Sequence, residues 1–283
     1  MIGAIRRQLS RLNATEGESR TLTARVVQGA LSILAGDAYG NVLRLVSNLI
    51  MTRLLFPEAF GLMLIVNLVL GALQMLSDMG IRGALITKRE GVDETYVNTA
   101  WTLSIIRGAA LCLVAFLAAW PVAEVYDEPQ LFGLILVSAF APLVQGLCSP
   151  FPILEEKKVK LTKVIVWRAL SQTVAVALTL GWLLMVPTIW ALAAHGVIGA
   201  LLLTVSSYYF FPNRTPRMAW NQQAAAEIFR FGKWVFVASS LAFLARNANQ
   251  LVVSKWVAID VLGVFSIAFS LSKLVEQVAG SMT

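Results

Sequence analysis

Long apolar segments alternate with short polar ones along most of this chain. Each apolar segment is close to the ~20 residues that a helix needs to cross the hydrocarbon core of a bilayer. The pattern predicts eight transmembrane helices, at residues 27–52, 62–81, 99–119, 131–151, 164–186, 188–211, 231–253 and 261–281. We therefore expect an all-α polytopic membrane protein. A single turn at Pro187 separates the fifth and sixth segments and predicts a tight helical hairpin.

The first apolar segment carries a polar stripe. Its members recur at steps of four, three and four residues, which places them on one face of a helix: Asp37, Asn41, Arg44 and Asn48. A guanidinium near the bilayer centre costs about 2.5–3.5 kcal/mol on insertion scales. This face is therefore expected to line the interior of a bundle or a wet cavity.

Glycines in the first apolar segment and prolines in and after the fourth give further predictions. Gly36 and Gly40 are four residues apart, a spacing that lets two helices approach closely. Pro142, Pro150 and Pro152 lie in and after the fourth segment and predict that this helix is kinked or ends there. A gate and a simple helix terminus are both open interpretations of these prolines.

Basic residues follow the loops in a regular alternation. If the N-terminus is inside, the cytoplasmic pieces hold 16 lysines and arginines, whereas the external connections hold only Arg53 and Lys255. This bias predicts that both ends of the chain are cytoplasmic. The loop V-A-E-V-Y-D-E-P-Q, with three carboxylates and no base, suits an external turn.

Composition agrees with a membrane protein. Of the 283 residues, 58% are hydrophobic and only 14% are charged, against roughly 25% charged in soluble domains. The net charge of +7 is explained by topology determinants rather than by nucleic acid. Cys112 and Cys148 both lie in apolar segments, so a disulfide framework is not expected. We interpret His195 as a helix-packing residue.

The segment before the first apolar run is different in character. Residues 1–12 place isoleucines and leucines on one face and arginines around the other, which is typical of a helix lying on an anionic membrane surface. No compact apolar core and cleavage site follow, so a secretory signal is disfavoured. Residues 1–25 are therefore interpreted as a cytoplasmic amphipathic segment.

A repeat relates the two ends of the chain. At an offset of 202 residues, Arg44 falls on Arg246, Gly61 on Gly263, and Asn48 meets Gln250. An even number of crossings intervenes, so the repeat is parallel and its axis runs along the membrane normal. We expect a six-helix lobe at 26–212, a cytoplasmic linker at 213–230, and the first two helices of an incomplete second lobe at 231–283.

No catalytic motif is present: the sequence has no Walker A loop, no G-x-S-x-G and no H-E-x-x-H. An enzyme and a metal site are therefore not expected. What remains is a set of bases inside the apolar segments: Arg44, Arg107, Arg168, Arg246 and Lys273. Snorkelling to the cytoplasmic end competes with substrate contact for Arg107 and Arg168. A local ion pair with Glu276 competes for Lys273.

Arg44 and Arg246 are the strongest candidates for a binding role. Ser239 stands in the later helix where Asp37 stands in the first, which leaves excess positive charge on the matching stripes. Planar guanidinium groups suit phosphate oxygens, so we favour attraction of an anionic ligand over structural pairing between helices. The candidate cavity residues are Asp37, Asn41, Arg44, Asn48, Arg246 and Gln250.

Several motifs carry a family resemblance, in the order T-R-L-L-F-P-E-A-F-G-L, L-S-D-M-G-I-R-G-A-L-I-T-K-R, Y-V-N-T-A-W, Y-D-E-P, F-R-F-G-K-W and D-V-L-G-V-F-S-I-A-F. From about Val26 to Thr283 the chain resembles the polysaccharide biosynthesis transporters, the oligosaccharide flippases of the multidrug/oligosaccharidyl-lipid/polysaccharide exporter superfamily. The resemblance implies a two-lobed bundle of twelve to fourteen helices around a basic cavity.

The resemblance also implies a function. Such proteins move undecaprenyl-diphosphate-linked sugars across the bacterial inner membrane by alternating access, with no cofactor and with coupling to a proton or sodium gradient. The expected partners are lipid-linked oligosaccharide, membrane lipids, a glycan polymerase and glycosyltransferases, but no nucleic acid. Two alternatives are open: extrusion of drugs or cations on the related fold, and a non-transporting membrane scaffold for glycan-assembly enzymes. The absence of four more helices predicts a fragment of a longer protein.

Overall fold

The structure is a computed structural model, and it describes residues 34–77, 80–88, 93–157, 161–211 and 215–280. Every regular element within these ranges is a helix. The first described helix covers residues 34–54. It is followed by α2 (Pro57–Leu76), α3 (Ile81–Thr87), α4 (Glu94–Val125), α5 (Gln130–Ser138), α6 (Phe140–Gly146), α7 (Phe151–Lys157), α8 (Leu161–Met185), α9 (Ile189–Phe210), α10 (Gln222–Trp256) and α11 (Ile259–Gly280). The amphipathic segment expected at 1–25 lies outside the described residues.

The all-α prediction is confirmed for the described residues, and each of the eight predicted segments overlaps a helix. Within the described ranges, 5 helices are long and apolar enough to cross a membrane, namely α2, α4, α8, α9 and most of α10. The bent run from α5 to α7 makes a sixth if it is counted as one span. In α11 the apolar part is shorter, Ile259–Phe269. Eight membrane crossings and the two-lobe layout therefore stay predictions.

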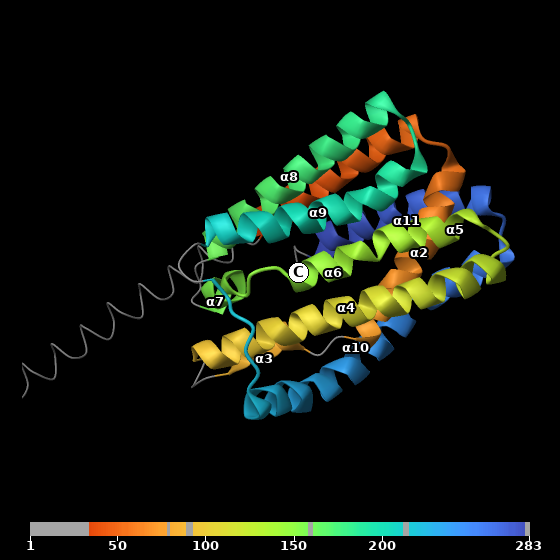
Figure 1. The fold of residues 1–283 in the computed structure, drawn as a ribbon. Helices are drawn as coiled ribbons and strands as arrows, with labels where there is room; N and C mark the ends of the chain where they lie inside the picture. The colour runs from red at the N-terminus through yellow and green to blue at the C-terminus, as the bar shows by residue number, and fades with distance from the viewer. Residues whose placement is uncertain (1–33, 78–79, 89–92, 158–160, 212–214, 281–283) are drawn as a thin grey trace, which may run out of the picture.

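The helices form one elongated bundle (Figure 1). The hairpin of α8 and α9 lies on one side, α4 and α10 lie on the other, and α2 runs obliquely between them with α11 alongside. The short helices α3 and α7 lie together at one end. We call this the basic end. The opposite end, which holds the tight turns after residue 54, α4, α8 and α10, is called the acidic end.

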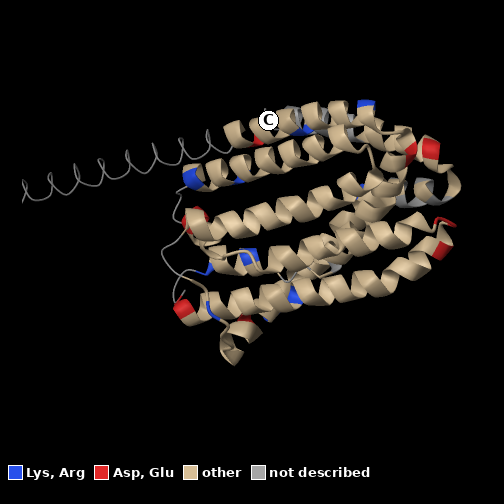
Figure 2. Ribbon diagram, turned by 45° about the horizontal axis from the view of Figure 1, so that its top comes forward, with Lys and Arg blue, Asp and Glu red and all other residues tan. Residues whose placement is uncertain are grey.

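The names follow the charges that Figure 2 shows. Described charges at the acidic end are mostly carboxylates, those of Glu58, Glu124, Asp127, Glu128 and Asp260. The basic end mixes carboxylates with most of the described bases, among them Arg82, Lys88, Lys157, Lys163 and Arg168. This separation follows the alternation of basic loops in the sequence.

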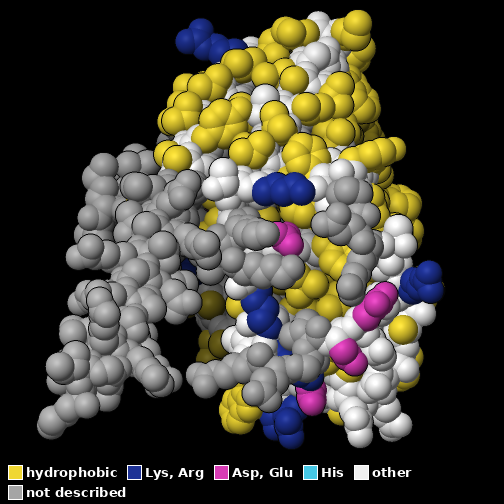
Figure 3. All heavy atoms as spheres, turned by 90° about the vertical axis from the view of Figure 1, so that its left-hand side faces the viewer, with side chains coloured by type: hydrophobic (Ala, Val, Ile, Leu, Met, Phe, Trp, Pro, Cys, Tyr) yellow, Lys and Arg dark blue, Asp and Glu magenta, His cyan; other side chains and the backbone are white. Residues whose placement is uncertain are grey.

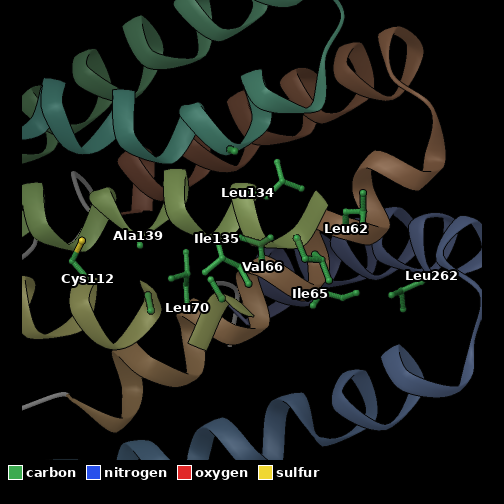
Figure 4. Close-up of a cluster of buried hydrophobic side chains, with 13 residues drawn as sticks. Leu62, Ile65, Val66, Leu70, Cys112, Leu134, Ile135, Ala139 and Leu262 are labelled. Atoms are coloured by element: carbon green, nitrogen blue, oxygen red, sulfur yellow. The ribbon is translucent and has the colours of Figure 1, made fainter. Parts of the chain in front are cut away.

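The main core surrounds α2, a largely apolar helix, as expected for a helix packed against several others. Ile65 and Val66 are 1% and 0% exposed, and they meet Leu134 and Ile135 of α5, which are both 0% exposed (Figure 4). Leu262 of α11 joins the same cluster. The core therefore links both sides of the bundle through α2.

The helices α2 and α11 touch through their backbones near the acidic end. A Cβ atom added to Gly61 would overlap the carbonyl oxygen of Ile259, and one added to Gly263 would overlap the carbonyl oxygen of Pro57. At the repeat offset of 202, Pro57 corresponds to Ile259 and Gly61 to Gly263. The contact is therefore reciprocal between matching residues, which is what the predicted repeat would produce.

The fourth predicted segment is broken, as its prolines suggested. The helical run ends at Gly146, and α7 restarts at Phe151 with a bend of 59°. Pro150 and Pro152 lie at this break. The bend carries α7 across the basic end to contact α3 and α8.

The connection from α9 to α10 is fastened to α4. The backbone N–H groups of residues 217 and 221 donate to the side-chain oxygens of Asn98 and Thr99, at 3.1 and 3.2 Å. Asn221 then caps α10 by accepting from two backbone N–H groups of its first turn. The helix begins at Gln222, so the latter part of the expected linker 213–230 is helical.

Candidate functional site

The first described helix and α8 lie close together because small residues face α8. A Cβ atom added to Gly36 would lie 2.5 Å from Cγ2 of Ile165, and one added to Gly40 would lie 3.4 Å from the Gln172 side chain. The hydroxyl groups of Tyr39 and Thr173 lie 2.7 Å apart at the same contact. The close approach predicted from Gly36 and Gly40 is confirmed, and it sets the polar stripe beside α8.

Some residues of the polar stripe are buried and others are exposed. Asn41 is 7% exposed, whereas Asp37 and Arg44 are exposed and Asn48 is half-buried. A terminal nitrogen of Arg44 donates to the side-chain oxygen of Asn41 at 2.9 Å. The stripe therefore supplies its own partner for the guanidinium, and the remaining N–H donors of Arg44 have no acceptor among the described residues.

Arg44 borders a hollow of about 280 Å³ at the basic end. Four elements contribute charged side chains to its wall: the first helix (Asp37 and Arg44), α3 (Arg82), α7 (Glu156) and α8 (Arg168). Three guanidinium groups face two carboxylates there, so the wall has a formal excess of one positive charge. Figure 3 shows the end face on which bases and acids gather below a largely hydrophobic surface. We call this cavity the arginine hollow.

Glu156 is the centre of the charge network in the arginine hollow. One of its carboxylate oxygens accepts from Arg82 at 2.6 Å and the other accepts from Arg168 at 2.6 Å. The Glu156 side chain is 9% exposed, whereas those of Arg82 and Arg168 are 58% and 47% exposed. A nearly buried carboxylate is thus held by two partly solvated guanidinium groups. This contact shows that Arg168 has a local partner as well as solvent.

The end of α7 is held by the residue next to Glu156. The Lys157 ammonium donates to the carbonyl oxygen of Leu85 at 3.1 Å and also to that of Lys88, both at the end of α3. Cations favour these carbonyl groups because the last turn of a helix leaves them without partners. The side chain of Lys88 in turn pairs with Glu227 of α10 at 2.7 Å.

Arg107 contacts the end of another helix. Its guanidinium is half-buried and donates to the hydroxyl of Ser77 at 3.1 Å and to the backbone oxygen of Gln74 at 3.0 Å. These acceptors lie at the C-terminus of α2, which ends at Leu76. Arg107 therefore caps that helix end, a role that sequence reasoning missed because nothing local in the sequence connects α4 to the end of α2.

The other predicted site residues lie elsewhere. Asn48 borders a second hollow of about 310 Å³, between the first helix, α2 and α11, together with Asn67 and Ser266. On α10, Arg246 is exposed and Gln250 is 5% exposed. Neither lines the arginine hollow. The pairing of Arg44 with Arg246 stays a prediction, and the side chain of Lys273 lies outside what the structure describes.

Two residues of the arginine hollow were not selected from the sequence. From the sequence alone Arg82 is one of the 16 bases of the cytoplasmic pieces, and no pattern points to Glu156. The sequence does hold one indication. An acidic pair stands in the run E-E-K-K after Pro152, and a basic segment, R-G-A-L-I-T-K-R, follows Gly80, so the two segments could form ion pairs. Such a pairing between distant loops becomes visible only once α3 and α7 are placed together.

The remaining polar groups fit helix packing. The Thr179 hydroxyl lies 2.8 Å from Nδ1 of His195, between α8 and α9, which confirms the packing role of this histidine. Cys112 and Cys148 are both free. Within the described ranges, no three side chains of the His, Cys, Asp or Glu type are grouped so as to hold a metal ion.

Comparisons with known proteins identify the family. The sequence profile of the polysaccharide biosynthesis protein family matches residues 50–283. The chain is 23% identical to the lipopolysaccharide biosynthesis protein WzxC of Escherichia coli K12, over 81% of this chain and 47% of that protein. It is 25% identical to the succinoglycan biosynthesis transport protein ExoT of Rhizobium meliloti, over 83% of this chain and 47% of that protein.

A further relative is the teichuronic acid biosynthesis protein TuaB of Bacillus subtilis, 22% identical over 70% of this chain and 41% of that protein. No solved structure matches the chain significantly. The chain spans about half the length of the curated relatives it matches. Its apolar helices and the residues that the profile covers lead to one conclusion: the chain belongs to the polysaccharide biosynthesis protein family of membrane proteins.

Proposed function

We propose that this protein is a flippase, which moves an undecaprenyl-diphosphate-linked oligosaccharide from the cytoplasmic to the periplasmic leaflet of the bacterial inner membrane by alternating access. The observation that carries the proposal is Arg44, a guanidinium on the first described helix that borders a hollow with excess positive charge. A diphosphate headgroup loses hydration when it leaves water. Guanidinium groups offset that loss with charge-assisted hydrogen bonds.

Family membership supports the proposal. One relative is named a transport protein for succinoglycan biosynthesis, and another belongs to lipopolysaccharide biosynthesis. The proposed orientation puts the basic end, with Arg82, Lys88 and Lys157, in the cytoplasm. The N-terminus is then cytoplasmic as well. Coupling to a proton or sodium gradient, and contact with a glycan polymerase and glycosyltransferases, belong to the same proposal.

The role of Arg44 is tested by charge reversal in the complete protein in its own cell. We expect Arg44→Glu, alone or with Arg246→Glu, to lower glycan export by at least about tenfold, because a hydrogen bond to a charged group is worth about that factor. Arg53→Glu is the matched control, since Arg53 lies on the same helix and is exposed near the acidic end. Undiminished export with both Arg44 and Arg246 as glutamate would rule out the diphosphate role.

Leaflet transfer separates the proposed activity from the alternatives. Purified protein is reconstituted in liposomes with a fluorescent lipid-linked oligosaccharide, and the dye that reaches the outer leaflet is measured. A flippase gives transfer that is lost in Arg44→Glu. A scaffold gives no transfer with either chain, and an exporter of drugs or cations moves a cationic dye instead.

A further inference from the structure

The arginine hollow contains a carboxylate where an anionic ligand would be expected. Glu156 accepts one hydrogen bond on each oxygen, from Arg82 of α3 and Arg168 of α8, each at 2.6 Å. These two guanidinium groups come from elements that are far apart in the sequence and meet only at this carboxylate. The arrangement is therefore a preformed receptor for an acidic group.

The carboxylate uses only part of the donor capacity of this receptor. A guanidinium carries five N–H donors in a planar fork. Among the described residues, Arg82 and Arg168 each donate one hydrogen bond, and both go to Glu156. Arg44, on the same wall, donates one, to Asn41. A phosphate group offers more acceptor oxygens than a carboxylate, so it matches this set of donors better.

The wall of the arginine hollow has an apolar part as well as a charged one. Leu161, Ile165 and Ala169 of α8 line the same hollow, and all three are half-buried. A charged group beside an apolar wall suits the phosphate of a lipid headgroup whose acyl chains lie along α8.

The end of α7 has an attachment that does not involve Glu156. Lys157 holds the end of α7 to the carbonyl groups of α3. A rotation of the Glu156 side chain alone would then free the two guanidinium groups. The carboxylate and a phosphate therefore compete for the same donors, and the energy of the ion pair sets the threshold that a ligand has to exceed.

We propose that the arginine hollow binds the phosphate of a lipid headgroup, and that Glu156 is an internal competitor that occupies the phosphate position. This site goes beyond the Arg44–Arg246 pair, since it places phosphate contacts on α3 and α8. It rests on the proposed flippase activity only if the lipid is the diphosphate-linked one. An anionic phospholipid of the membrane offers the same chemistry.

The test is direct lipid binding by the full chain, purified in detergent and measured by native mass spectrometry. The probes are a polyprenyl diphosphate, phosphatidylglycerol, and diacylglycerol as a lipid without phosphate. We expect Arg82→Gln with Arg168→Gln to weaken phosphate-lipid binding by at least about tenfold, the factor for hydrogen bonds to charged groups. Diacylglycerol binding should not change. Lys163→Gln is the matched control on α8, because Lys163 is exposed and does not line the hollow.

The Glu156→Gln variant gives a second test, because its expected result is tighter binding and a folding defect would not produce that. Removing the competing charge should tighten phosphate-lipid binding by about threefold to tenfold, whereas a purely structural Glu156 would give no gain. A loss for polyprenyl diphosphate alone in the double arginine variant identifies the lipid-linked substrate. An equal loss for phosphatidylglycerol identifies a general phospholipid site, and either result supports the proposal.

Two results would overturn the site: unchanged binding in the folded double arginine variant, or a Glu156→Gln chain that binds phosphate lipids no more tightly than the original. If the double variant does not fold, the glutamine variant decides. The proposed function fails separately, when reconstituted protein binds phosphate lipids as expected but transfers no oligosaccharide between leaflets.

Discussion

At the acidic end α2 and α11 meet backbone to backbone at Gly61 and Gly263, whereas at the basic end α3, α7, α8 and α10 are joined by charged side chains. The first kind of contact has no room for an added methyl group and no side chain that can rotate away. The second kind depends on partly exposed charges that water and salt can replace. The charged contacts can therefore be lost by rotating side chains, whereas the glycine contact is lost only if whole helices move, and at the basic end a buried hydrophobic cluster of α3, α4 and α10 holds the helices as well.

The largest effect is expected at the glycine contact. Gly263→Val places a Cβ atom against the carbonyl oxygen of Pro57, so α2 and α11 must move apart. We expect a destabilisation of about 3 kcal/mol, at the upper end of the cost of overpacking. Thermal unfolding of the purified chain measures this. The control is Gly181→Val on α8, where an added Cβ atom meets nothing within 4 Å.

If both valine variants unfold at the same temperature, the backbone contact at the acidic end is not a specific constraint. If only Gly263→Val is destabilised, the distinction between the two ends stands.

The second effect is expected at the C-terminus of α2, towards the basic end. Arg107→Met removes a donor from the Ser77 hydroxyl and from the Gln74 carbonyl, which keep the hydrogen bond that the hydroxyl donates to the carbonyl. We expect a loss of about 2 kcal/mol, because these are hydrogen bonds from a charged and half-buried group. Chemical denaturation of the purified chain provides the measurement. A variant as stable as the original would show that the C-terminus of α2 does not need this cap.

A smaller effect is expected where the linker crosses α4. Thr99→Val keeps the shape of a side chain that is 0% exposed but removes the acceptor for the backbone N–H of Asn221. We expect a cost of about 1 kcal/mol and faster cleavage of the linker in limited proteolysis. The control is Thr87→Val, since the hydroxyl of Thr87 is exposed and bonds only within its own helix. Equal cleavage rates would mean that the linker is not held by this contact.

The smallest effect is expected for the ion pair between α3 and α10. In Lys88→Met the pair with Glu227 is lost, but the two side chains are 24% and 46% exposed. We expect a destabilisation of less than about 1 kcal/mol, and high salt should reduce the difference from the original chain. Thermal unfolding at low and high salt measures both. A loss as large as that of Gly263→Val would remove the distinction between the two ends.

The sequence predicted the elements that follow a long apolar pattern. The helices overlapping all eight predicted segments were found because hydropathy is a property of each segment by itself. The break after Gly146 was anticipated from Pro150 and Pro152, since proline acts locally on the backbone. The close approach of the first described helix to α8 was predictable as well, because the spacing of Gly36 and Gly40 is a local feature of the sequence.

The site was less predictable because its contacts connect distant segments. Helices α3 and α7 have 7 residues each, too short to produce a periodic signal, and they are held by packing and ion pairs at the basic end. Nothing in the sequence alone therefore links Arg82 to Glu156. The sequence leaves snorkelling and substrate contact open for Arg107, because its partners, the last groups of α2, come from another helix.

The reciprocal contact of α2 with α11 makes this single chain resemble a two-fold dimer. In such a dimer one surface is complementary to itself, and each residue change is felt twice. Here the two matching surfaces belong to different segments of one chain, so Gly61 and Gly263 can be altered one at a time. Because both glycines belong to one interface, the free energies of the two single variants should not add in the double variant. The chain thus allows the two halves of a symmetric interface to be measured separately.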